Sequence, residues 1–251
     1  MPPTEYRAPR LLCLSFFLLL SLPNLLRAQA GPPMVTDDPG TPGDGHYEIN
    51  IAVLSDGHAY ELPLIDFNYG VGDRVQLKLE TPYEVETQPS RRTGLGNGLA
   101  GVKWRFFDQG DDGWQISTYP QIQFVYPTSS SAKRGLAEPG TNLLLPVEIQ
   151  RNVGGFEVGF ETGRWLRQND DDSWIVGLVV GKPLSERLET MAEIHDEESI
   201  GSSRRELLAN VGARLKLSDT FVLLVSIGRD LHNSIDDTNN VISYLGLQIL
   251  L

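Results

Sequence analysis

A stretch of twelve residues, RVQLKLETPYEV at positions 74–85, separates its side chains by polarity. Val75, Leu77 and Leu79 alternate with Gln76 and Lys78, and the pattern continues to residue 85. Because side chains point to opposite faces of a β-strand in turn, this pattern predicts a strand with one apolar and one charged face. Twelve residues span roughly 40 Å at the usual strand rise, which is long enough for a tilted strand to cross a membrane.

The same two-residue period recurs along most of the chain. It predicts about twelve strands, at residues 46–55, 60–69, 74–86, 99–107, 114–126, 143–150, 156–166, 174–182, 188–196, 207–216, 221–229 and 241–251. Residues 174–180 and 221–225 are apolar on both faces, so we expect parts of the interior to be packed rather than wet. The chain has 25 glycines, 16 prolines and few helical patterns, so it is predicted to be all-β, with many strands separated by turns.

The connections between these strands alternate in length. Short turns at 70–73, 108–113, 152–155, 183–187 and 217–219 alternate with longer polar segments at 87–98, 127–142, 167–173, 197–206 and 230–240. An antiparallel up-and-down transmembrane β-barrel has tight turns at one end and larger loops at the other. The spacing therefore predicts such a barrel over residues 46–251, with both ends of the chain on the short-turn side.

Two segments precede the barrel. Residues 1–30 hold basic residues, an apolar run at 11–22 and Ala28-Gln29-Ala30, the pattern of a secretory signal peptide cleaved near Ala30. Residues 31–45 contain four prolines and four glycines, so we expect an N-terminal periplasmic strap that leads into the first strand. The sequence leaves open whether this strap enters the barrel.

The net charge excludes one class of partner. The full sequence carries −12, and residues 1–30 contribute three arginines against one glutamate, so cleavage leaves −14. Such an acidic chain is an improbable nucleic-acid ligand, so no nucleic acid is expected as a partner. The only cysteine, Cys13, lies in the predicted signal, so the mature chain has neither disulfides nor cysteine metal ligands.

Alternation also assigns polar side chains to the barrel interior. A charge at the bilayer midplane costs ~2–4 kcal/mol, so charged residues on spanning strands must point inward. The candidates for lining the lumen are Gln76, Lys78, Glu80, Lys103, Arg105, Gln121, Gln123, Glu148, Gln150, Glu157, Glu161, Glu189, Glu193 and Arg214. They predict either a permeation path or a charge-paired interior that fills a narrow barrel, and the sequence does not choose between them.

The ends of the strands carry further signals. Aromatic residues near strand ends suit interfacial girdles; they are Tyr47, Tyr69, Tyr83, Trp104, Trp114, Tyr126, Trp174 and Tyr244. The final residues place Tyr244, Gly246, Ile249 and Leu251 at the spacing of a C-terminal assembly signal, which implies recognition by the barrel assembly machinery. Bacterial barrels usually end in Phe or Trp, and this chain ends in Leu.

Three segments resemble one family. PPMVTDDPGTPGDGHYEINIA at 32–52, ELPLIDFNYGVGDRVQLKLETPY at 61–83 and GLGNGLAGVKWRFF at 94–107 are similar to the outer-membrane barrel family labelled for a meta-pathway of phenol degradation. The resemblance is most specific where Pro33, Thr36, Asp37 and Asp38 precede Gly45-His46-Tyr47-Glu48. It implies a transporter-like barrel in the cell outer membrane of a Gram-negative bacterium, and it brings no catalytic residues.

Signals for an enzyme, a cofactor or a metal are weak. The histidines at 46, 58, 195 and 232 have no metal-ligand spacing. His232-Asn233-Ser234 has the His-x-Ser spacing of outer-membrane phospholipases, but it lies in a predicted loop and matches by chance more readily than by function. Asp170-Asp171-Asp172 and Thr36-Asp37-Asp38 could hold calcium, although solvated acidic loops are commoner. We therefore expect no catalytic residues, no cofactor and no resident metal.

The leading hypothesis is a passive channel or porin-like transporter for small solutes, aromatic or hydrophobic ones included, that sits in outer-membrane lipid. Its alternatives are a non-conducting barrel with a structural or surface-interaction role and a soluble secreted β-barrel that binds a ligand, as lipocalins do with eight strands. Twelve strands with polar alternate faces argue against the soluble barrel.

The first prediction concerns location. The mature chain should co-fractionate with outer membranes and migrate faster on gels when unboiled, because a closed barrel resists unfolding by detergent. Membrane fractionation and paired boiled and unboiled samples measure this. Recovery of a soluble periplasmic monomer would refute the membrane interpretation.

Overall fold

The computed structural model describes residues 31–57, 59–87, 90–110, 112–234 and 241–251. The predicted signal peptide, residues 1–30, lies outside the described residues, as do His58 and most of the segment before the last strand. In the described part of the chain, fourteen strands form one antiparallel sheet. They are β1 (Tyr47–Ser55), β2 (Ala59–Val71), β3 (Val75–Glu86), β4 (Arg92–Leu95), β5 (Gly98–Asp108), β6 (Trp114–Thr118), β7 (Gln121–Phe124), β8 (Thr141–Val153), β9 (Phe156–Leu166), β10 (Ser173–Pro183), β11 (Leu188–Ser199), β12 (Arg205–Lys216), β13 (Phe221–Asn233) and β14 (Val241–Leu250).

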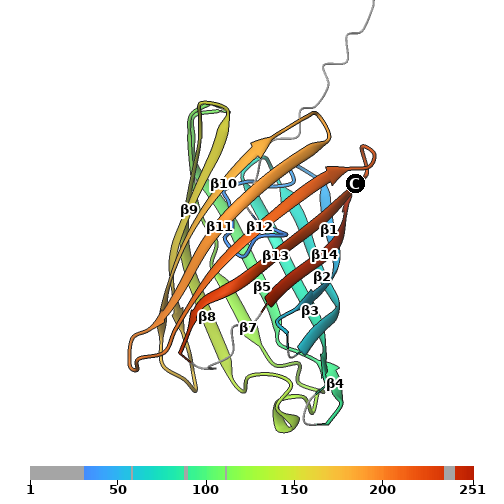
Figure 1. Ribbon diagram of the computed structural model, residues 1–251, viewed down its shortest axis with the longest axis vertical. Helices are drawn as coiled ribbons and strands as arrows, with labels where there is room; N and C mark the ends of the chain where they lie inside the picture. The colour runs from blue at the N-terminus through green and yellow to red at the C-terminus, as the bar shows by residue number, and fades with distance from the viewer. Residues whose placement is uncertain (1–30, 58, 88–89, 111, 235–240) are drawn as a thin grey trace, which may run out of the picture.

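The sheet closes into a barrel of twelve wall strands. The first strand, β1, pairs with the last, β14, over Glu48↔Leu250 to Ser55↔Ser243. Both β4 and β5 pair with β3, so they form one wall strand that is interrupted at residues 96–97. Both β6 and β7 pair with β5 and β8, so they form another, interrupted at 119–120. The predicted all-β antiparallel barrel of about twelve strands is confirmed (Figure 1).

The turns explain the two ends of the barrel. The β8–β9 hairpin has a two-residue loop, Gly154-Gly155, and both residues have positive φ, which suits the tight turn that matches strand twist. The opposite end carries the longer segments, including the short 3₁₀ helix η1 (Ala132–Arg134) between β7 and β8. We call these the short-turn end and the long-loop end. The chain's C-terminus lies at the short-turn end (Figure 1).

Burial in this barrel is inverted relative to a soluble protein. Many outward-facing side chains are large, apolar and exposed, and they include Ile51, Ile65, Phe67, Leu77, Leu79, Val102, Trp104, Ile122, Phe160, Val176, Leu178, Val211, Ile227 and Leu245. The buried side chains are largely polar, with Asn50, Glu148 and Glu189 almost fully enclosed. An exposed apolar belt of this kind requires apolar surroundings, so the outer face of the wall suits hydrocarbon while the inner face encloses a polar interior.

The interior also contains the predicted dry patches. Val222 and Leu224 join Ala52, Leu64 and Tyr244 in one buried apolar cluster. In a second cluster, Val179 packs with Met191 and with Met34 of the N-terminal segment. The expectation that parts of the interior are packed rather than wet is therefore confirmed, through the inward-facing residues Val179, Val222 and Leu224.

The aromatic girdle needs one correction. Tyr47, Trp104, Trp114 and Trp174 are exposed on the outer surface, as expected for interfacial aromatics. Tyr244 instead points inward, with 8% of its surface exposed, because its strand position shares a face with Gly246. It belongs to the lumen and not to the girdle.

Among the described residues, no helix is long and apolar enough to span a membrane.

The apolar belt yields a stability prediction. Leu79→Arg, on the outer face of β3, should cost ~2–4 kcal/mol of barrel stability if it lies near the bilayer midplane. Urea unfolding in lipid vesicles measures the loss. Glu186→Arg, in the exposed turn between β10 and β11, is the control and should leave stability unchanged. Equal losses for the two variants would contradict the assignment of the outer face.

Candidate functional site in the barrel lumen

The first described residues lie inside the barrel. Thr36 is fully buried, and Met34 and Asp38 are nearly so. We call residues 31–41 the plug segment; it forms the blue coil within the ring of strands in Figure 1. Beyond it the chain passes along the rim, where Gly45 N–H donates to the Gly70 carbonyl at 3.1 Å. The segment that the sequence predicts as a strap therefore also enters the lumen, which alternation alone could not decide.

Acidic wall residues hold the backbone N–H groups of the plug segment. The Glu193 carboxylate accepts from Thr36 N–H at 2.5 Å and from Val35 N–H at 3.1 Å. The Glu161 carboxylate accepts from Asp37 N–H at 3.0 Å. Charge-assisted bonds of this type are stronger than neutral ones, so two predicted lumen acids act as anchors for the plug segment.

Basic and hydroxyl wall residues hold its carbonyls. Arg214 donates to the Pro32 carbonyl at 2.7 and 2.9 Å and to the Gly31 carbonyl at 3.2 Å. Ser226 donates to the Pro33 carbonyl at 2.9 Å. A proline-rich segment has few donors of its own but keeps all its carbonyls, so an arginine is a suitable partner.

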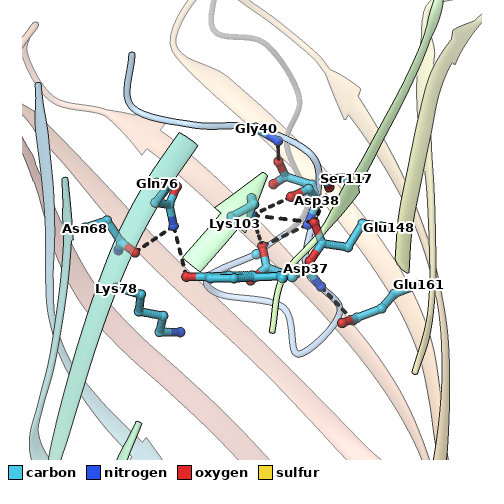
Figure 2. A network of polar contacts seen from close by, with 12 residues as sticks. Asp37, Asp38, Gly40, Asn68, Gln76, Lys78, Lys103, Ser117, Glu148 and Glu161 are labelled. Carbon is cyan, nitrogen blue, oxygen red and sulfur yellow. Dashed lines mark hydrogen bonds and ion pairs between the residues drawn. The ribbon is translucent and has the colours of Figure 1, made fainter. Parts of the chain in front are cut away.

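A lysine at the centre of the lumen joins the plug segment to the wall (Figure 2). Lys103, 2% exposed, places Nζ 2.7 Å from Asp37 Oδ1 and also donates to the Asp38 carbonyl. Its ammonium lies 3.9 Å from Glu148 and 4.6 Å from the Tyr119 ring centroid. Ser117 donates to Glu148 at 2.5 Å. Because a buried charge needs partners, this group is coupled, and the plug segment supplies one of the carboxylates.

A second polar group lies beside it on β2 and β3. Lys78 Nζ is 2.9 Å from Glu80 and 3.8 Å from Asp66. Gln76 donates to Asn68 at 2.7 Å and to the Tyr119 hydroxyl at 3.1 Å. Tyr119 thus contacts both groups, which makes the centre of the lumen one continuous polar network (Figure 2).

The structure places every predicted lumen residue on the inner side of the wall. Those that are buried are Gln76, Lys103, Gln121, Glu148, Gln150, Glu157, Glu161, Glu189, Glu193 and Arg214. Lys78, Glu80, Arg105 and Gln123 are partly buried. Glu189 lies 3.7 Å from Arg214, and Arg105 binds Asp108 at 3.1 Å. A role for these side chains in permeation stays a prediction.

The sequence prediction of lumen residues left out several side chains that point inward. Asn50, Asp66, Asn68, Asn210 and Asp230 are buried, and the alternation of their strands was a sufficient signal for most of them. Glu61 is different, because strict alternation through β2 would place it on the lipid side with Ile65 and Phe67. The pairings of β2 with β1 and with β3 both shift register at residues 62–63, which indicates a β-bulge. As a result, Leu62 is exposed and Glu61 lines the interior.

The residues of the proposed assembly signal divide between two faces. Tyr244 and Gly246 point inward, whereas Leu251 is exposed at the end of β14. Backbone bonds between Tyr47 and Leu251, at 2.8 and 3.0 Å, complete the seam there. Recognition of these residues by assembly machinery stays a prediction.

The candidate calcium segments have cationic partners. Arg204 binds Asp170 through two nitrogens, and the hydrogen bond from Arg204 lowers the pKa of that carboxyl to about 2. Asp172 accepts from Arg164 at 2.7 Å, and Asp37 has Lys103. The described residues hold no group of three or more His, Cys, Asp or Glu side chains arranged for a metal ion. The His-x-Ser segment at 232–234 lies at the long-loop end, where the Ser234 hydroxyl accepts a hydrogen bond from Arg205 N–H at 2.6 Å.

A cavity of about 390 Å³ remains beside the plug segment. Its lining is mixed, with residues 31–35 and 37 of the plug segment, apolar wall residues such as Leu54 and Ile175, and the acids Glu61 and Glu197. The lumen is thus partly filled and partly open to a small molecule.

Comparisons with known proteins agree on the architecture. No family model matches the chain, and no curated protein sequence matches it. Among solved structures, an outer membrane channel from Pseudomonas putida F1 is similar with a TM-score of 0.62 and 12% identity, over 86% of this chain and 100% of that one. The NanC porin gives a TM-score of 0.61 at 12% identity, over 81% and 98% of the two chains. The KdgM porin gives 0.59 at 11% identity, over 80% and 98%.

These likenesses define the class by fold. The chain has the porin-like β-barrel fold of bacterial outer-membrane channels, shared at sequence identities of 11–12%.

The plug segment yields a cross-linking prediction. A Cβ built on Gly177 of β10 would lie 2.9 Å from Thr36 Cβ, so a small adjustment brings a cysteine pair to disulfide distance. The variant Thr36→Cys/Gly177→Cys should form this bond in the folded barrel, detected by mass spectrometry of linked peptides. Thr36→Cys/Gly154→Cys, with the second cysteine in an exposed turn, should not. Absence of the first bond from heat-modifiable barrel would place the plug segment elsewhere.

Proposed function

We propose that this protein is an outer-membrane channel through which small solutes pass passively. The observation that carries the proposal is the inversion of the wall, with a continuous apolar exterior and a charged, hydrogen-bonded interior. An apolar exterior implies lipid as the surrounding partner and argues against a soluble ligand-binding barrel. The long-loop end then faces the cell exterior, and residues 31–45 enter from the periplasmic side.

The solute class is part of the proposal. Aromatic and hydrophobic solutes suit the lumen because its cavity has both apolar and polar walls. The KdgM porin has been solved in complex with disordered oligogalacturonate, which supports the passage of small solutes through a barrel of this kind. The link to phenol degradation rests on the sequence resemblance alone.

A second candidate function has its own observation. The plug segment occupies the centre of the lumen and is bonded to it by Glu193, Glu161, Lys103 and Arg214. If these bonds persist in the membrane, the protein is a non-conducting barrel with a structural or surface-interaction role. Conductance of refolded protein in planar bilayers separates the two, and a complete absence of channel events would favour the closed barrel.

The charges of the lumen predict the selectivity of an open channel. By alternation, six glutamates among the lumen candidates point inward against four basic residues (Lys78, Lys103, Arg105 and Arg214), and the buried Asp66 and Asp230 add to the acidic excess. A narrow lumen with low-dielectric walls focuses this field, so cations should permeate better than anions. Anionic aromatics such as benzoate should then pass less readily than neutral phenols.

The measurement is the reversal potential across a salt gradient. Wild-type protein should show weak cation preference, and Arg105→Gln should strengthen it by removing a base near the short-turn mouth. Arg187→Gln, in an exposed turn outside the lumen, is the matched control and should leave the reversal potential unchanged. Anion preference in the wild type would contradict the charge argument.

A further inference from the structure

The cavity beside the plug segment is large enough for a small organic molecule. Its volume of about 390 Å³ exceeds the ~150 Å³ of an engineered apolar cavity that holds benzene. One part of its lining is apolar; it includes Leu54, Leu64, Leu144, Ile175, Ile242 and Tyr244. An aromatic or alkyl body is therefore compatible with this part of the wall.

A row of aligned residues places the Glu61 carboxylate next to that apolar wall, with Glu84 one strand further on. Tyr244 pairs with Leu54, Leu54 with Glu61, and Glu61 with Glu84, across β14, β1, β2 and β3. Neighbouring strands lie about 4.8 Å apart, so the distance from Tyr244 to Glu61 across two strand spacings is about 10 Å. A phenyl ring with a short alkyl arm has that span.

The two carboxylates have no cation of their own. Among the described residues, no lysine, arginine or histidine forms an ion pair with Glu61 or Glu84, whereas neighbouring Glu80 has Lys78 and Glu86 has Arg92. Glu61 and Glu84 lie directly opposite each other in register. Like charges in this arrangement are destabilising, so a cation placed between them would be favoured.

Other polar groups in the same lining also lack donors. Gln121 is 5% exposed, and no described residue donates a hydrogen bond to its Oε1. Asn210 Oδ1 likewise receives no hydrogen bond from a described residue, whereas the Asn210 amide nitrogen donates to Glu193 at 3.3 Å. Donors of the same lining are in use, since Lys78 binds Glu80, Ser226 donates to the Pro33 carbonyl, and His195 contacts the Thr36 hydroxyl. The cavity thus has an excess of acceptors, and a ligand rich in N–H donors would satisfy them.

We propose that this cavity is a binding site for a small organic cation, a protonated amine on an aromatic or short alkyl body. The ammonium lies at Glu61, which lines the cavity and has Glu84 opposite it in register, and the apolar body packs on Leu54 and on the Tyr244 ring. The inference deepens the proposed channel function, because it assigns a solute class to a site inside the same lumen.

Equilibrium binding tests the assignment without any requirement for conduction. Refolded full-length protein in detergent micelles is titrated calorimetrically with 2-phenylethylammonium, 2-phenylethanol and phenylacetate, and empty micelles are subtracted. The ammonium should bind at least about tenfold more tightly than the alcohol, and phenylacetate should bind more weakly than both. Equal affinity for ammonium and alcohol would overturn the proposal.

Two variants locate the site. Glu61→Gln should reduce affinity for the ammonium to that for the alcohol, whereas Leu54→Ser should weaken both. Glu186→Gln, an exposed turn residue, controls for loss of net charge and should leave the affinities unchanged. Heat-modified migration on gels checks that each variant is folded.

The outcomes separate this inference from the channel proposal. Unchanged ammonium affinity in folded Glu61→Gln protein would overturn the inference even if the barrel conducts. Selective binding by a barrel that conducts no ions would support the inference and refute the channel.

Discussion

The cost of an unpaired backbone group in hydrocarbon is the constraint on which this structure depends. Each unsatisfied N–H or C=O costs several kcal/mol there, so a sheet can stand in lipid only if it has no free edge. The β1–β14 pairing provides that closure, and the bonds between Tyr47 and Leu251 extend it to the rim. Once the wall is closed, the pleat sends every second side chain inward, so the charges of all twelve wall strands collect in one narrow space.

Those collected charges must be neutralised within the lumen, and the plug segment is part of that neutralisation. Lys103 faces Glu148 at 3.9 Å but Asp37 at 2.7 Å, so its closest acid comes from the plug segment and not from the wall. Glu193 and Glu161 likewise accept N–H groups from it. Removing one partner from a buried charged group is costly, so the wall and the plug segment stabilise each other. Glu61 departs from this pattern, because no described basic residue forms an ion pair with it, and its place in the cavity lining makes it a candidate ligand-binding group.

Local alternation was enough to predict most of the wall. Residues such as Val75–Glu86 carry the two-residue period clearly, so strand positions, facing and barrel closure followed from the sequence. The two-residue period does not reveal a β-bulge, so the sequence pattern places Glu61 on the lipid side, whereas the strand register around Leu62 places it inside. Interruptions were missed for a similar reason: Pro120 lacks a backbone donor, yet its neighbours keep the same facing on β6 and β7. Contacts between the plug segment and the wall join residues from 65 to 193 positions apart, and no local pattern encodes them.

The attachment of the plug segment at Tyr47 has a kinetic consequence. The segment is joined to the first wall strand at the rim through residues 42–46, so if it leaves the lumen it remains tethered at the mouth of the barrel. Short tethers give effective concentrations in the millimolar range, and loops of about ten residues close in ~10–100 ns. Bonds too weak to hold a free peptide would therefore keep the lumen filled most of the time. The equilibrium between filled and empty lumen is intramolecular, so it is independent of how many copies of the protein the membrane contains.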